Sequence, residues 1–355
     1  MNRRPPRSGR KPDTAGRTGR RGGKSEPLAL NWSALTQDDL PEVSGLLTAI
    51  EHFDEPSERH TLEELTEAFH ETDADPQSNT RLGRDAGGTL IGFGWVHPFS
   101  SDVDPRRVFL DGGVHPGWRG KGVGHQLLDW QISRAADWDA QTRTAEHGPV
   151  QLVIHIEEKL IDRAELAADR DFAAVRWFAD MSLKFDALDG PIPPVPVLDG
   201  IRIEPFTMER SEQVRQAHNE AFADHWGSQP VPETRWQERL RASASRAEWS
   251  WVATEADTGE VVGYAMNAAY PQDWESQGFR EGWTDRLGVR RAWRGRRIAH
   301  ALLLASMHSF ADAGLQAAGL GVDTDNPSGA FGLYTRLGYE RGETQVMYAR
   351  TEPRT

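Results

Sequence analysis

Hydrophobic and polar positions follow two similar series along this chain, one before and one after a proline-rich segment. The first series opens with the apolar stretch 28–35, which predicts a strand, and Thr36 then caps a helix with apolar residues at helical spacing. The second opens with Ile201–Glu204, where apolar and charged residues alternate as in a half-buried strand, and Thr207 precedes the next helix. The two threonines lie 171 residues apart.

Each series continues with a hairpin. In the first, the turn 84–88 leads into the apolar strand Thr89–Val96. In the second, the turn Asp257–Gly259 joins Trp251–Thr254 to Val261–Ala265. The same order of strand, helix and hairpin is therefore expected in each half of the chain.

The segment Pro191–Pro196 separates the two series. Its prolines can neither continue a helix nor donate hydrogen bonds to a sheet, so it is expected to be an extended connection. A chain of 355 residues is long enough for two domains of ordinary size. We expect a first domain at residues 27–188, a linker at 189–200 and a second domain at 201–355.

After the hairpin, each half contains a loop rich in glycine and basic residues. Val114 and Val289 end apolar strands 175 residues apart, and each is followed by a tryptophan, an arginine and a glycine at the same spacing. An amphipathic helix begins after each loop. A match over eleven positions, at nearly the offset of the preceding elements, indicates a duplicated domain.

The residues of these loops suit an anionic ligand. Loop amides and the first turn of a helix present several N–H groups to one anion, and the helix dipole adds to the attraction. Glycine allows close approach of the backbone, while Arg119 and Arg294 supply positive charge. An ordinary turn with solvated arginines is the alternative, but its occurrence twice beside equivalent strands favours a phosphate site.

On these residues the chain is identified as a member of the GNAT superfamily of acyl-CoA-dependent N-acyltransferases. The signature of that family is Arg/Gln-x-x-Gly-x-Gly/Ala between its fourth strand and third helix. Arg119–Gly124 matches it fully, whereas Arg294–Ala299 has Arg297 where the family usually has glycine. Either the second loop holds the phosphates differently, or its affinity is reduced.

The resemblance implies an α/β fold with two tandem GNAT-like domains, each a mixed, mostly antiparallel sheet flanked by helices. It implies acetyl-CoA as co-substrate and no metal. The residues expected to bind acetyl-CoA are Val114, Arg119, Gly120, Lys121, Gly122, Val123, Gly124, Leu287, Val289, Arg294, Gly295, Arg296, Arg297, Ile298, Ala299 and Asn326.

The second half carries a further block of the family pattern. A buried strand at 319–324 is followed by a helix-start signal at 325–328 and by a helix that contains Tyr334. The resemblance implies that Asn326 contacts the pantetheine arm or the helix start, and that Tyr334 lies near the cofactor sulfur. A core aromatic is the alternative for Tyr334. The first half has Ala167 at the equivalent position, so no hydroxyl is available there.

The two halves are therefore altered in complementary ways. The first has the more regular loop, and the second retains the candidate acid, so we expect chemistry in the second half. The first half would then bind acyl-CoA structurally or serve as a scaffold. This resembles the architecture of mycothiol synthases, GNAT proteins that pair a poorly active N-terminal domain with a catalytic C-terminal one. No residue string in the chain identifies the mycothiol precursor as the substrate.

The expected reaction is direct transfer of acetyl to a primary amine in a ternary complex. The backbone N–H of Val289 would stabilise the oxyanion, and Tyr334 would act as general acid on the leaving thiolate. Asp285 is the candidate base, with Glu281 second, although either carboxylate also suits a solvated strand edge. The tryptophan-containing segments 225–228 and 269–274 are expected to form pocket walls without identifying the acceptor.

Charge separates the first residues from the rest. The net charge is −13, but residues 1–24 hold nine Lys and Arg against one Asp, so the rest carries −21. We expect residues 1–26 to be a disordered basic tail that makes at most limited contacts with nucleic acid, and the acidic body to attract amines. The sequence contains no cysteine and no apolar run of about 18 residues, which fits a cytoplasmic protein that does not cross a membrane.

The expected acceptor is a small-molecule or peptide amine, and the chain is expected to be a monomer or a homodimer. Two other classes of function stay open at this stage. A non-catalytic acyl-CoA sensor or scaffold would bind the cofactor without transferring acetyl to any amine. A nucleic-acid-binding protein would lose binding when residues 1–24 are removed, and its affinity would fall steeply with salt.

Overall fold

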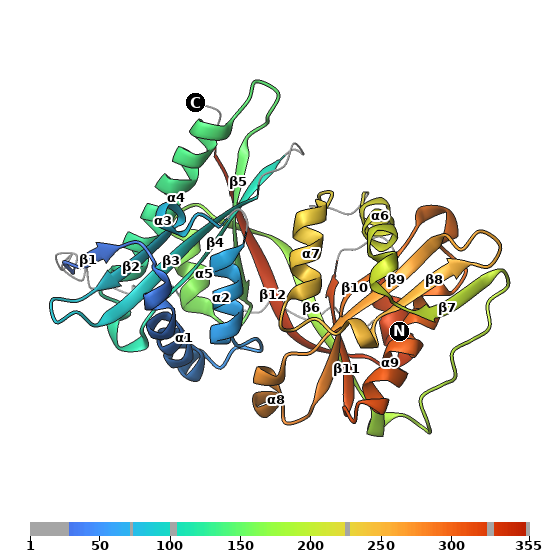
Figure 1. Ribbon diagram of the computed structural model, residues 1–355. Helices are drawn as coiled ribbons and strands as arrows, with labels where there is room; N and C mark the ends of the chain where they lie inside the picture. Colours follow the sequence, from blue (N-terminus) through green and yellow to red (C-terminus); the bar gives the residue numbers. More distant parts are fainter. Residues whose placement is uncertain (1–27, 72–73, 100–104, 224–227, 325–329, 353–355) are drawn as a thin grey trace, which may run out of the picture.

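The computed structural model describes residues 28–71, 74–99, 105–223, 228–324 and 330–352 (Figure 1). Among the sequence predictions, the basic tail at 1–26, the helix-start signal at 325–328 with the cofactor contact of Asn326, and residues 225–227 of one pocket wall lie outside these described residues.

The first half consists of one strand, then helices, and then a meander of strands interrupted by two further helices. Its strands are β1 (Asn31–Ser33), β2 (Thr80–Arg84), β3 (Leu90–Phe99), β4 (Arg106–Val114), β5 (Val150–Glu157) and β6 (Ala173–Lys184). Its helices are α1 (Leu40–Asp54), α2 (Leu62–His70), α3 (Pro76–Asn79), α4 (Val123–Thr142) and α5 (Ile161–Ala168).

The second half repeats this order with two changes: it has two helices instead of three between its first and second strands, and a further helix between its third and fourth strands. Its strands are β7 (Ile201–Pro205), β8 (Trp251–Glu255), β9 (Val261–Ala268), β10 (Glu281–Val289), β11 (Ala317–Asp323) and β12 (Glu340–Thr351). Its helices are α6 (Ser211–Ala221), α7 (Glu233–Arg241), α8 (Pro271–Gln277), α9 (Ile298–Asp312) and α10 (Ala330–Leu337).

The twelve strands of the described residues form one sheet, in the order β1-β2-β3-β4-β5-β12-β6-β11-β10-β9-β8-β7. Only the β4–β5 and β10–β11 pairs are parallel among the described strands, so the predicted mixed, mostly antiparallel arrangement is confirmed. The two halves exchange their last strands. The first half's β6 lies between β12 and β11, and the second half's β12 lies between β5 and β6. Figure 1 shows β12, in red, beside the green β5.

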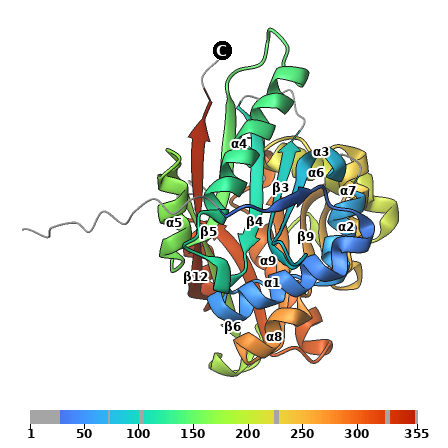
Figure 2. The ribbon, with the colours of Figure 1, turned by 90° about the vertical axis from the view of Figure 1, so that its left-hand side faces the viewer.

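Helices cover both faces of the sheet in each half. Apolar residues of α1 and α2 pack on β2 and β3, whereas α4 packs with β4 and β5 on the other face (Figure 2). In the second half, α6 and α7 pack with β8 and β9, and α9 packs with α10, β11 and β6. The helical spacing of apolar residues in the sequence is thus explained by a sheet beneath each helix.

The proline-rich segment connects the halves without a helix or strand of its own. Leu188, Ile192 and Val195 pack against the core of the second half, and His308 Nε2 lies 2.9 Å from the Pro193 carbonyl oxygen. The segment therefore lies against the second half. The domain limits at residues 188 and 201 stay a prediction, because strand exchange makes each half contribute to the sheet of the other.

Candidate active site

The parallel strand pair of each half separates partway along its length. In the first half β4 pairs with β5 as far as Phe109, but β4 continues to Val114. In the second half β10 pairs with β11 as far as Thr284 and continues to Val289. Past those points the backbone groups on one side of β4 and β10 have no paired strand beside them.

The backbone N–H of Val289 faces this unpaired side. The next residue, Arg290, donates its N–H to the Val262 carbonyl on the opposite side, at 2.9 Å. Consecutive N–H groups of an extended strand point in opposite directions, so Val289 directs its N–H toward the space between β10 and β11. Val289 thus has the direction required of an oxyanion donor.

The loops that follow β4 and β10 have the same backbone conformation. Gly120 and Gly295 have φ of +72° and +79°, while Gly122 and Arg297 have φ of +80° and +62°. Each of the latter two carbonyls accepts the first helical hydrogen bond at 3.1 Å. Arg297 therefore keeps the left-handed conformation of glycine, at a cost of about 1 kcal/mol. The first turn of α9, like that of α4, leaves backbone N–H groups available to an anion.

The loop arginines begin alike and differ in their partners. Arg119 Nε donates to the Val114 carbonyl at 3.3 Å, and Arg294 Nε donates to Val289 at the same distance. The Arg119 guanidinium also makes two hydrogen bonds to Asp54, at 2.6 and 2.8 Å. Arg294 instead donates to the Ala221 carbonyl at 2.7 Å, which leaves its charge uncompensated among the described residues.

A cavity of about 570 Å³ occupies the diverging strands of the first half. Its wall includes Val114, Arg119, Gly120, Gly122 and Gly124 from β4 and the loop, and Ala167 from α5. The structure therefore brings five of the seven predicted cofactor residues of this half to one cavity. The other two do not line it: the Lys121 ammonium lies over the Trp118 ring, and Val123, the first residue of α4, is buried.

The equivalent position in the second half is filled by Tyr334. The backbone hydrogen bonds support the equivalence of Ala167 and Tyr334. The Phe172 N–H donates to the Ala167 carbonyl, and the Tyr339 N–H donates to the Tyr334 carbonyl. The Tyr334 side chain packs in the core cluster that Leu287 of β10 also contacts, and the residue is 8% exposed. Burial raises its pKa to about 12, so the phenol stays protonated at neutral pH.

The two candidate bases lie at different points of β10. Asp285 stands at an irregularity in the pairing with β9, where the parallel pairing with β11 has ended, and its Oδ1 accepts the Tyr270 hydroxyl at 2.9 Å. Glu281 lies in the part of β10 still paired with β11, and Ser182 donates to it. Burial raises the pKa of Glu281 to about 7. Only Asp285 is beside the diverging strands.

A second pocket, of about 220 Å³, lies between the two halves. The first half contributes Glu64 and Glu67 of α2, and the second contributes residues of α7, β9 and β10 together with Tyr270. Sequence reasoning did not find Glu64, Glu67 or Arg239, because no local pattern indicates that α2 and α7 meet. Of the two predicted pocket walls, 269–274 provides Tyr270, and part of 225–228 lies outside the described residues.

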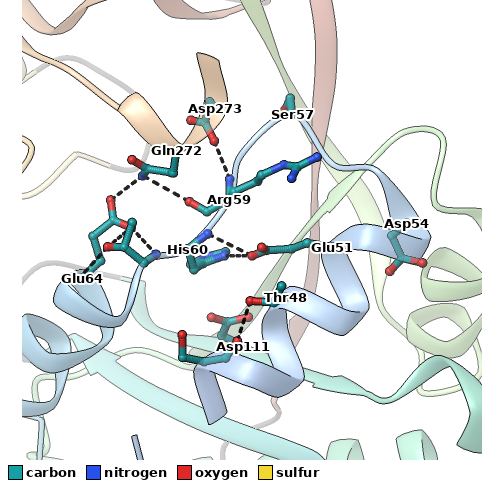
Figure 3. A network of polar contacts seen from close by, with 12 residues as sticks. Thr48, Glu51, Asp54, Ser57, Arg59, His60, Glu64, Asp111, Gln272 and Asp273 are labelled. Atoms are coloured by element: carbon teal, nitrogen blue, oxygen red, sulfur yellow. Dashed lines mark hydrogen bonds and ion pairs between the residues drawn. The ribbon is translucent and has the colours of Figure 1, made fainter. Parts of the chain in front are cut away.

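Polar contacts fix the first half against α8 beside this pocket (Figure 3). Arg59 N–H donates to Asp273 Oδ1 at 2.8 Å, and Gln272 Nε2 donates to Glu64 Oε1 at 2.9 Å. His60 Nδ1 lies 2.9 Å from Glu51 Oε1, and this hydrogen bond raises the His60 pKa to about 9. The segment between α1 and α2 is therefore held to the second half by several directed contacts.

None of the helices in the described residues is both long and apolar enough to span a membrane. Within the same residues, no group of three or more histidine, aspartate and glutamate side chains is arranged to hold a metal ion.

Comparisons with known proteins agree with this geometry. The model of the acetyltransferase (GNAT) family matches residues 46–149 and 211–339. A mycothiol acetyltransferase of Pseudarthrobacter chlorophenolicus is 30% identical over 298 residues, which span 81% of this chain and 80% of that protein. Another, of Nocardiopsis dassonvillei, is 28% identical over 284 residues, 74% of this chain and 79% of that protein.

Solved structures share the fold of the whole chain. A GCN5-related N-acetyltransferase from Sphaerobacter thermophilus has a TM-score of 0.72 at 24% identity, covering 92% of this chain and 97% of that one. A tandem GNAT protein from the clavulanic acid biosynthesis pathway has a TM-score of 0.67 at 17% identity, covering 92% and 100%. The chain therefore belongs to the acetyltransferase (GNAT) family, and it is an N-acetyltransferase with two such domains in tandem.

Proposed function

We propose that the chain transfers acetyl from acetyl-CoA to the primary amine of a small molecule, and that the transfer takes place in the second half. The observation that carries this proposal is the grouping on β10: the Val289 N–H faces the diverging strands, Leu287 meets the Tyr334 cluster, and Asp285 lines the pocket between the halves. The relatives named mycothiol acetyltransferase support an acceptor of low molecular weight.

In the proposed reaction the neutral amine attacks the thioester carbonyl carbon. Negative charge develops on the carbonyl oxygen, and the N–H of Val289 stabilises it. The carbon–sulfur bond then breaks, and the thiolate takes the phenolic proton of Tyr334 while Asp285 accepts the proton of the amine. Solvent afterwards returns a proton to Tyr334 and removes one from Asp285.

The loop at 294–299 is proposed to hold the pyrophosphate of the reacting acetyl-CoA. Arg294 has no carboxylate partner among the described residues, and Arg296 and Arg297 follow it in the loop. Backbone N–H groups at the start of α9 add directed donors to this charge. Asn326 stays a predicted contact of the same cofactor.

For the first half we propose binding of acyl-CoA without turnover. Its cavity of about 570 Å³ is lined by Arg119, Gly122 and Gly124 of the signature, but Ala167 offers no acid. Ala167→Phe should fill this cavity and abolish one of the acetyl-CoA binding events seen by calorimetry, with kcat unchanged. Ala168→Phe, at the exposed neighbouring position, is the control. If Ala167→Phe loses turnover and Ala168→Phe does not, this assignment is contradicted.

The proposed function as a whole is tested by acetyl-CoA binding and by turnover on a panel of small amines. We expect steady-state acetylation of at least one amine, with release of free CoA measured by a thiol reagent. Cofactor binding without transfer to any amine would favour the sensor or scaffold instead.

A further inference from the structure

The pocket between the halves contains charges of both signs. Its volume of about 220 Å³ is below the usual range for drug-sized ligands, so it suits a compact molecule. The charged and hydroxyl-bearing side chains that line it are Glu64, Glu67, Arg239, Ser245, Tyr270, Asp285 and Arg286.

The two arginines of this pocket lack strong partners. Arg239, on α7, forms no hydrogen bond or ion pair with any of the described residues, although it is only partly exposed. Among the described residues, Arg286 has one carboxylate contact, in which its Nη1 lies 3.6 Å from Oδ2 of the neighbouring Asp285. Burial and the nearby Arg286 lower the Arg239 pKa to about 10. Two cations that repel each other in a partly buried site are costly unless an anion joins them.

Each carboxylate of the pocket already accepts a hydrogen bond from a residue other than the two arginines. Glu67 Oε1 accepts the Ser243 N–H at 2.7 Å. Glu64 accepts the Thr61 N–H at 2.8 Å and the Gln272 amide at 2.9 Å. Asp285 accepts the Tyr270 hydroxyl. None of these carboxylates forms an ion pair with Arg239, although the charges of Glu71 and Asp285 offset part of the repulsion that it meets from Arg286 and Arg235. An external anion could pair with Arg239 directly.

We infer that the acceptor is a small zwitterion with an α-amino-acid-like end, whose carboxylate is held by Arg239 and Arg286 and whose amine lies beside Asp285. This inference rests on the proposed acetyl transfer in the second half. Guanidinium groups bind carboxylates with directed, charge-assisted hydrogen bonds. The three carboxylates in the same pocket disfavour a doubly charged phosphate and favour a ligand that also carries an ammonium group.

The position of the pocket supports this assignment. Asp285 and Arg286 are adjacent at the irregular point of β10, so a site for the amine and a site for the anion lie next to each other. The other arginine comes from α7, and the opposite wall comes from α2 of the first half. A bound zwitterion would therefore contact both halves of the chain.

The test uses pairs of acceptors that differ only at the carboxylate: common amino acids and dipeptides against their carboxamides. With the full chain we expect kcat/KM for the carboxylate of each accepted pair to exceed that for the amide by about 30-fold or more, as for a buried charge pair. Arg239→Met should reduce the carboxylate to the level of its amide and leave the amide unchanged. Arg241→Met, at an exposed position of the same helix, should change neither.

The outcomes separate this inference from the proposed function. Equal rates for acids and amides, unaltered in Arg239→Met, would overturn the inference and leave acetyl transfer standing. If no amine is acetylated, the proposed function fails. Calorimetric binding of the same amino acids to the wild-type protein and to Arg239→Met then still decides the inference, because absence of binding, or equal binding, would refute it. Melting curves of both variants check that they are folded.

Discussion

The two phosphate loops of this chain have nearly the same backbone and different surroundings. Gly122 and Arg297 share the left-handed conformation, and both loop arginines donate to the last carbonyl of the preceding strand. Yet Arg119, in the loop that fits the family signature, is neutralised by Asp54, and Arg294, in the loop that departs from it, is not. Agreement with a backbone motif therefore says little about how much charge the loop offers to a ligand.

The largest effect is expected from removing the candidate general acid, Tyr334, which the second half has and the first half lacks. Tyr334→Phe removes the hydroxyl and keeps the ring, so kcat should fall by about 10²–10⁴-fold with little change in acetyl-CoA affinity. Tyr339→Phe is the matched control, because Tyr339 is also buried, lies 6.0 Å away between ring centres, and has no hydrogen-bond partner for its hydroxyl among the described residues. Near-normal turnover in Tyr334→Phe, or an equal loss in Tyr339→Phe, would refute the acid role.

The next effect compares the loop arginines. Arg294→Ala should raise KM for acetyl-CoA about tenfold, since it removes a charge proposed to face the pyrophosphate. Arg119→Ala should leave turnover within about twofold but lower Tm. The side chain of Asp54, 6% exposed, would keep Arg163 at 3.5 Å as its one cationic partner in the described part of the chain. If Arg119→Ala abolishes activity while the second half still binds acetyl-CoA, the proposed division between the halves is wrong.

A smaller effect concerns the pH dependence of stability, which comes from buried carboxylates near the contact between the halves. Burial raises the pKa values of Asp180, Asp273 and Glu281 to about 7, above their ordinary values near 4. A raised pKa means that the folded state binds more protons, so this stabilisation is full below about pH 4 and is lost as pH rises through 7. Tm should fall by about 5 °C between pH 6 and pH 8.

Asp273→Asn tests one part of that pH dependence. The amide still accepts the Arg59 N–H but does not titrate, so the fall in Tm between pH 6 and pH 8 should become shallower. Differential scanning calorimetry at matched ionic strength gives both slopes. Identical slopes for the variant and the wild type would show that Asp273 does not titrate in this range.

The smallest effect is expected when the residues at the left-handed position of the two loops are exchanged. Arg297→Gly should stabilise the chain by up to about 1 kcal/mol, and Gly122→Arg should destabilise it by a similar amount. Chemical denaturation measures both changes. If Arg297→Gly lowers stability, contacts of the arginine side chain must outweigh the backbone cost.

The sequence predicted those features that depend on local pattern. The repeated strand, helix and hairpin and the duplicated loops follow from periodicity and from turn residues within short windows. The helices α2, α3, α7 and α8 were not predicted. The helix that carries Tyr334, α10, was predicted from the spacing of Leu333 and Leu337, whereas a core position for Tyr334 was only the alternative interpretation. Such features need no knowledge of distant contacts.

The remaining features depend on residues far apart in the chain. Asp54 lies 65 residues before Arg119, and its charge alone gave no sign of this pairing. The pocket between the halves joins Glu64 to Arg239, which no spacing rule connects. The left-handed Arg297 was visible only as a departure from the family signature, and its backbone conformation required coordinates.

The exchange of β6 and β12 has a consequence for synthesis on the ribosome. The first half cannot complete its sheet until β12 has been made, because β12 is the strand that pairs with β5. At about 5–20 residues per second, the interval between β5 and β12 lasts on the order of 10–40 s. During that time the edge of β5 is open to mispairing with other nascent strands. Nascent chains that carry β5 but not β12 should therefore depend on chaperones more than the finished protein does.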